Sequence, residues 1–172
     1  MTAADQTESR AVAERWCGYE PGEVREFYDD ASYFLDCGDY ENWLELFAPE
    51  APYLAIAREN HERGLPLATI RCDSRDMLAD RVDAIEHTQF YARRIVRHFT
   101  SAIRPSGTTP QGALRCTANF LVVETLVDEG SMVHSVGEYL DELVARDGRL
   151  RFLSRVAVYD APLVPTSLVI PL

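Results

Sequence analysis

The stretch "RRIVRHFTSAI", residues 93–103, is the point at which the spacing of the apolar residues changes along the chain. Two sets of residues alternate in it: Ile95, Arg97, Phe99, Ser101 and Ile103 against Val96, His98, Thr100 and Ala102. Neighbouring side chains of a β-strand point to opposite faces of a sheet, so this period of two predicts a strand. The second half of the chain is therefore predicted to build a sheet.

Three more runs of this character follow: "LRCTANFLVVETL" at 114–126, "SMVHSVGEYLDELV" at 131–144 and "LRFLSRVAVYDA" at 150–161. The "DEG" and "RDG" segments between them are typical of hairpin turns, whereas "RPSGTTPQG" at 104–112 is predicted to be a longer loop. Strands usually have about five or six residues. Because these runs are longer, the sheet must twist and curl, and its concave face needs a cover.

The first half of the chain has a helical period and is predicted to supply this cover. Between Gly22 and Gly38 the apolar residues form one stripe, made of Val24, Phe27, Tyr28, Ala31, Phe34 and Leu35. A short helix is predicted over 40–47, a short strand over 52–58, and a further helix after Ser74, which is placed to cap it. The sequence thus predicts an α+β domain, with N-terminal helices packed on a strongly curved, mainly antiparallel sheet.

The composition describes one globular domain. A chain of 172 residues suffices for one well-buried core, and we expect an N-terminal extension over 1–19, flexible or a short helix, before a single domain over 20–172. The formal net charge of -11, from 28 acidic and 17 basic residues, argues against a nucleic-acid partner. The chain shows neither a secretory pattern nor an apolar run of roughly 18 residues that would suit a membrane, so a cytoplasmic location is predicted.

A polar cluster in "ENHERGLPLATIRCDSRDMLADRV", residues 59–82, raises the question of a metal or acid/base site. No regular element would bring His61, Cys72 and Asp73 onto one face, and the four cysteines match no metal-binding spacing, so they are interpreted as reduced, mostly core thiols. Residues 59–73 are interpreted instead as a loop that leads to the Ser74 cap and as a subunit interface. The tail "PLVPTSLVIPL" is expected either to close its own domain or to dock on a neighbour, because exposed aliphatic strips favour aggregation. The predicted interface residues are Arg58, His61, Arg63, Leu65, Leu67, Arg71, Leu168 and Ile170.

An ordered series of segments resembles the small (β) subunit of aromatic-ring-hydroxylating dioxygenases. The segments are "FYDDASYFLDCGDYENWLELFAPEAPYLAI", "ENHERGLPLATI", "SRDMLADRV", "RHFTSAI", "CTANFLVVET" and "RVAVYDAPLVPTSLVIPL", which run from about Glu20 to Leu172. The resemblance implies the cone-shaped fold of the nuclear transport factor 2-like superfamily. The pair "GLPLATI" and "SRDML" is most similar to subunits that serve oxygenases of small aromatic carboxylates such as salicylate or terephthalate.

The resemblance also implies a division of labour between subunits. A large (α) subunit would carry the Rieske [2Fe-2S] centre and the mononuclear iron, and this chain would be a non-catalytic, structural partner in an α3β3 hexamer, self-associating as a trimer. A separate reductase or ferredoxin would supply electrons. The residues agree, because none of the four cysteines has a histidine two or three positions later and the glycines form no dinucleotide-binding loop. No cofactor or metal is therefore expected in this chain.

The alternative is a free-standing isomerase, hydratase or small-ligand-binding protein of the same fold. Its pocket would use Tyr33, Asp36, His98 and Tyr159, because a carboxylate or histidine desolvated beside aromatic rings is suited to acid/base work. Each residue also has a structural interpretation. Asp36 would face water in the last turn of its helix, His98 would be a hydrogen-bonded strand histidine, and the tyrosines would be core aromatics with hydroxyls at the rim.

Overall fold

The computed structural model of the chain describes residues 16–88, 92–161 and 168–172. The helices are α2 (Pro21–Cys37), α3 (Tyr40–Glu45), α4 (Arg58–Glu62), α5 (Arg75–Asp83) and the π-helical turn η1 (Ala84–Thr88). The strands are β1 (Tyr53–Ala57), β2 (Ile70–Cys72), β3 (Arg94–Thr108), β4 (Leu114–Leu126), β5 (Ser131–Arg146) and β6 (Arg149–Tyr159). None of the described helices is long and apolar enough to cross a membrane.

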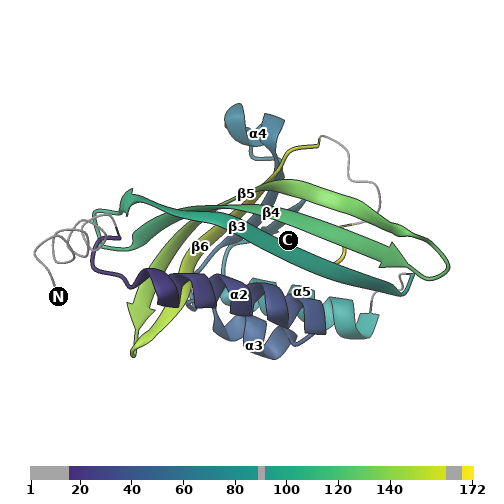
Figure 1. Ribbon diagram of the computed structural model, residues 1–172, viewed down its shortest axis with the longest axis horizontal. Helices are drawn as coiled ribbons and strands as arrows, with labels where there is room; N and C mark the ends of the chain where they lie inside the picture. The colour runs from purple at the N-terminus through teal and green to yellow at the C-terminus, as the bar shows by residue number, and fades with distance from the viewer. Residues whose placement is uncertain (1–15, 89–91, 162–167) are drawn as a thin grey trace, which may run out of the picture.

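The strands form one curled sheet in the order β2-β1-β6-β5-β4-β3. All neighbouring strands are antiparallel except β1 and β6, which are parallel. Helices α2, α3 and α5 lie along one face of the sheet, whereas α4 projects from the opposite side (Figure 1). The predicted α+β class, with helices first and a curved, mainly antiparallel sheet afterwards, is confirmed.

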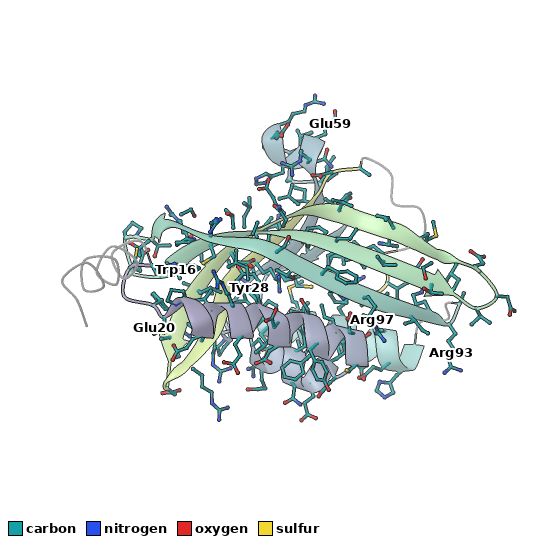
Figure 2. All side chains as sticks on the ribbon, in the orientation of Figure 1. Trp16, Glu20, Tyr28, Glu59, Arg93 and Arg97 are labelled. Atoms are coloured by element: carbon teal, nitrogen blue, oxygen red, sulfur yellow. The ribbon has the colours of Figure 1, made fainter. Side chains whose placement is uncertain are left out.

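Aromatic side chains fill the space between the helices and the sheet. The stripe predicted on α2 is buried at Val24, Phe27, Tyr28, Ala31 and Leu35. The largest fully buried side chains also include Trp16, Trp43, Tyr53, Tyr139, Phe47, Phe120 and Phe152. Figure 2 shows Tyr28 between α2 and the sheet, and Glu59 on the projecting α4, away from this core. Since burial of one aromatic or large aliphatic side chain contributes about 1.5–3 kcal/mol, this layer is the main source of stability.

The structure corrects two sequence-based predictions. The predicted loop at 104–112 is strand as far as Thr108, because β3 lies at the sheet edge, where Pro105 costs no ladder hydrogen bond and two register shifts absorb the irregularity. The predicted loop at 59–73 contains most of α4 and the three residues of β2. Both elements are too short to show a period in the sequence.

The two edges of the sheet are protected in different ways. Strand β2 is only three residues long. At the other edge, the Asp36 carboxylate at the end of α2 accepts a hydrogen bond of 2.9 Å from the backbone N–H of His98 on β3. Short strands, bulges, edge prolines and covered N–H groups all prevent a sheet from pairing with another chain along its edge.

The turn predicted from "RDG" is confirmed as a two-residue hairpin between β5 and β6. Asp147 and Gly148 both have positive φ angles, of 53° and 73°. This conformation matches the twist of the flanking strands and favours Asn or Asp followed by Gly.

Gly137 on β5 is the glycine at which an added Cβ atom would meet other atoms within 4 Å, and replacement by alanine is expected to be strongly destabilising. A Cβ atom there would lie 2.0 Å from the Val158 carbonyl oxygen and 2.8 Å from the Tyr159 Cα atom. Because backbone atoms cannot move aside locally, Gly137→Ala should lower the free energy of unfolding by about 3 kcal/mol or more, measured by urea denaturation. Gly130→Ala, where a Cβ meets nothing within 4 Å, is the matched control and should change it by less than about 1 kcal/mol. Equal effects of the two substitutions would contradict this packing.

Candidate functional site

Of the four residues of the alternative pocket, the structure brings two together. Asp36 and His98 are in contact, with 2.8 Å between Asp36 Oδ1 and His98 Nδ1. Tyr33 is 63% exposed on α2, and the buried Tyr159 hydroxyl hydrogen-bonds with the Thr69 hydroxyl instead. The four side chains therefore do not line one cavity.

The contact between Asp36 and His98 follows from the position of β3 at the sheet edge. The backbone N–H of His98 has no strand partner on that side, and Asp36 Oδ1 accepts from both this N–H and the imidazole Nδ1. The Asp36 side chain is only 16% exposed, so the expectation that it faces water is wrong. His98 is a buried strand histidine with hydrogen-bond partners on both ring nitrogens, because its Nε2 lies 3.2 Å from the Pro171 carbonyl oxygen.

The described part of the tail, residues 168–172, closes the open end of the domain next to this pair. Val169 and Leu172 are buried in the core, and Leu168 and Ile170 pack against it. The Tyr53 hydroxyl accepts from the Leu172 N–H at 2.8 Å and lies 3.0 Å from the Leu172 carbonyl oxygen. The Arg81 guanidinium donates to the carbonyl oxygens of Leu168 and Val169. Of the two roles expected for the tail, the described part takes the first and closes its own domain.

The space left beneath the tail is about 10 Å³, lined by Arg94, His98, Glu124 and His134 among others. A single water molecule needs roughly 10–15 Å³, so an organic substrate does not fit in this closed arrangement. The polar groups around it bind one another: Arg94 pairs with Glu124 at 2.6 Å, and His134 Nδ1 lies 2.7 Å from the Ser135 hydroxyl. Burial lowers the pKa of His134 and favours its neutral form.

The seating of the tail can be tested with two leucine truncations. Leu172→Ala removes a side chain that is 1% exposed and should lower the melting temperature by roughly 5–15 °C, because a leucine truncation in a core costs about 2–5 kcal/mol. Leu67→Ala makes the same chemical change at a residue that is 64% exposed and should shift it by less than about 2 °C. If scanning calorimetry gave both variants the same melting temperature, Leu172 would not be seated in the core.

A second polar cluster, which sequence reasoning missed, lies at the centre of the core. Asp141 and Arg155 face each other on β5 and β6, with 3.7 Å between Asp141 Oδ1 and Arg155 Nε, and the Tyr28 hydroxyl donates to Asp141 Oδ2 at 2.7 Å. The Arg155 guanidinium lies 3.7 Å from the centroid of the Tyr139 ring. Burial raises the pKa of Asp141 to about 6, although the Arg155 charge opposes the shift. The signal in the sequence was the alternation along this strand, which places Asp141 on the same face of the sheet as Tyr139.

Asp141 has the raised pKa of a candidate acid/base group, but it is 2% exposed and its carboxylate is enclosed by Tyr28 and Arg155. The cluster is therefore architectural. It joins α2 to two strands of the sheet through one carboxylate.

A double-mutant cycle should reveal the coupling of the Asp141 and Arg155 charges. Asp141→Asn or Arg155→Met alone leaves the other charge buried without its partner and should lower the free energy of unfolding by about 3–5 kcal/mol. The double variant should cost clearly less than the sum of the two, by at least about 1 kcal/mol in urea denaturation. If the single variants fail to fold, recovery of a folded double variant gives the same answer. Strict additivity of the two losses would contradict the coupling.

The arginines predicted for a subunit interface are already paired within the chain. Arg58 contacts Glu138 at 2.8 Å and Asp160 at 2.7 Å. Arg63 pairs with Glu59 and Arg71 with Asp73, each at 2.9 Å. In the remainder of this segment His61 and Leu67 are exposed, whereas Leu65 is half-buried.

The cysteines and histidines do not gather around a metal position. Within residues 16–88, 92–161 and 168–172, no group of three His, Cys, Asp or Glu side chains is placed to hold a metal ion. Of the four cysteines, Cys72 and Cys116 are buried. The expectation of mostly core thiols is therefore wrong for Cys17 and Cys37, which are exposed.

The curled sheet with helices on its concave face defines a cone-fold protein of the nuclear transport factor 2-like class. The family described as "Ring hydroxylating beta subunit" matches residues 30–166, and the chain belongs to this family. It is 31% identical to the anthranilate 1,2-dioxygenase small subunit of Burkholderia cepacia, over 80% of this chain and 85% of that protein. It is also 31% identical to the terephthalate 1,2-dioxygenase terminal oxygenase component subunit beta 2 of Comamonas sp., over 80% and 89%.

The solved structures agree with this assignment. A crystal structure described as the β subunit of an aromatic-ring-hydroxylating dioxygenase from Novosphingobium aromaticivorans has a TM-score of 0.78 and 30% identity to the chain. The match covers 88% of this chain and 95% of that one. The expected family and cone fold are thus confirmed.

Proposed function

We propose that this chain is the non-catalytic, structural small subunit of a multicomponent aromatic-ring-hydroxylating oxygenase. The observation that carries the proposal is the closed end of the cone, where the chain's own tail leaves about 10 Å³ beside His98 in a protein of the ring-hydroxylating β-subunit family. Because the closed end of the cone has no room for a substrate, we infer that the subunit contributes to the reaction by holding another chain.

The partner is the large subunit, in which we place the Rieske [2Fe-2S] centre and the mononuclear iron. A Rieske centre requires two cysteines and two histidines, and an oxygenase iron requires two histidines and a carboxylate. The part of this chain that the structure describes has no such grouping, which supports a location outside it. We further propose an α3β3 hexamer, a cytoplasmic location, and a separate reductase or ferredoxin as the electron source.

The substrate class follows from the relatives. The two relatives reported above are named for anthranilate and terephthalate, which are both small aromatic carboxylates. We propose a substrate of this class, selected in the large subunit. The alternative of a free-standing isomerase, hydratase or binding protein requires residues 168–172 to leave the core, because they cover His98.

Co-expression with the neighbouring open reading frames should recover a brown complex. Pull-down through a tag on this chain is expected to yield a larger second polypeptide together with iron, measured by metal analysis, and the visible absorption of an iron-sulfur cluster. The same tagged chain expressed alone is the control and should be colourless and inactive. A colourless lone chain that converts a substrate would overturn the proposal.

A further inference from the structure

The face of the sheet opposite the helices carries an exposed apolar surface on β3, β4 and β5. We define the outer patch as Ile95, Phe99, Leu121, Val123, Val133 and Val136. Ile95, Phe99 and Val133 are 58%, 55% and 53% exposed, which is high for large apolar side chains on a sheet. The buried Val96 and His98 alternate with Ile95 and Phe99, so the outer patch faces away from the core.

The strand register makes this surface continuous. Phe99 lies opposite Leu121, which lies opposite Val136. In the next row, Val123 lies opposite Val133. The paired residues lie on adjacent strands, and cross-strand neighbours on one face have Cβ atoms about 5 Å apart. A bulge on β5 between these rows turns both Val133 and Val136 outward.

Two further features extend the same face. A hollow of about 320 Å³ lies along it, lined by Thr117, Leu140 and Val156 among other residues. Helix α4 projects on this side of the sheet (Figure 1), and its first residue, Arg58, reaches β5 through Glu138. The face therefore offers apolar area, a recess for a protruding side chain, and a raised border.

The charge of this face differs from the charge of the chain. The chain has 28 acidic residues, but the acidic residues of β3, β4 and β5 are only Glu124, Glu138, Asp141 and Glu142. Glu124 and Asp141 are buried in the interior. Glu138 and Glu142 pair with Arg58 and Arg115. The outer face thus lacks the excess negative charge that repels other proteins elsewhere on this chain.

A second copy of the chain is a poor occupant for this face. A two-fold contact would bring the exposed Arg104 of both copies into one interface, where the outward-facing acidic residues of β3, β4 and β5, Glu138 and Glu142, are already paired with Arg58 and Arg115. The acidic groove of about 410 Å³ beside α2, lined by Glu23, Glu26 and Glu45 among others, is complementary in charge but lies on the helix side of the molecule. A contact between the outer patch and this groove would join opposite faces of neighbouring copies, and it closes into a ring only for particular rotations between the copies.

We propose that the outer face of β3–β5 is the surface on which the large oxygenase subunit docks. This inference rests on the proposed function. The matching surface of the large subunit presents an apolar protrusion for the hollow, with carboxylates placed toward the arginines at the margin of the outer patch.

The test uses the complex recovered by co-expression, with a charge placed in the outer patch. Phe99→Glu and Val133→Glu change exposed side chains and leave the core intact, so thermal midpoints should stay within a few degrees of the wild type. The amount of large subunit recovered with each should fall roughly tenfold or more, because a buried unpaired carboxylate is a strong penalty at an interface. Two variants on different strands keep the test decisive if one fails to fold.

The matched control is Tyr33→Glu, at an aromatic residue that is 63% exposed on the helix side. It should recover the large subunit as well as the wild type does. Undiminished recovery with both outer-patch variants would overturn the inference and leave the proposed function standing. Retention of the large subunit with a lower complex mass in light scattering would assign the face to a second copy, which also overturns it. Failure of the wild-type chain to recover any large subunit would overturn the proposed function, and the inference with it.

Discussion

The pairing of Asp141 with Arg155 inside the core is the constraint on which the rest of the structure depends. A buried guanidinium is costly unless a carboxylate pairs with it, and aromatic faces add further attraction; here Asp141 supplies the carboxylate, and Tyr139 and Phe152 supply the faces. The same carboxylate accepts from Tyr28 on α2. One interaction therefore sets the register of β5 against β6 and the position of the longest helix on the sheet.

Closure of the cone depends on a second set of polar contacts, which use side chains to bind backbone groups. Asp36 satisfies an N–H of the edge strand, and His98, Tyr53 and Arg81 meet backbone groups of the tail. Buried backbone groups without partners are costly, so these side chains allow an edge strand and a non-helical segment to lie in the core. An acid/histidine pair, which in an open pocket suggests catalysis, has here an architectural role.

The period of apolar residues was enough to predict the helical stripe on α2 and the four long strands. The turn residues predicted the hairpins, and Ser74 predicted the cap, in which its side chain accepts from the Met77 N–H. The period has limits. It could not predict the three-residue β2, nor the strand character of Arg104–Thr108, which depends on edge placement. It also gave no partner to Asp141, because a contact with Tyr28 spans 113 positions. The sequence did not decide whether the tail packs on its own domain or on a neighbouring chain, since its aliphatic residues suit a core and an interface equally.

The parallel pairing of β1 with β6 has a consequence for the synthesis of this protein. Tyr53 is aligned with Arg155, and its hydroxyl contacts Leu172, 119 positions later. During translation β1 and the helices before it leave the ribosome long before their partners exist, so their apolar faces stay uncovered until the end of the chain emerges. Long-range contacts of this kind slow folding and prolong exposure to aggregation and to chaperones. The interval between synthesis of β1 and synthesis of β6 is therefore the stage at which the nascent chain is most exposed to misfolding.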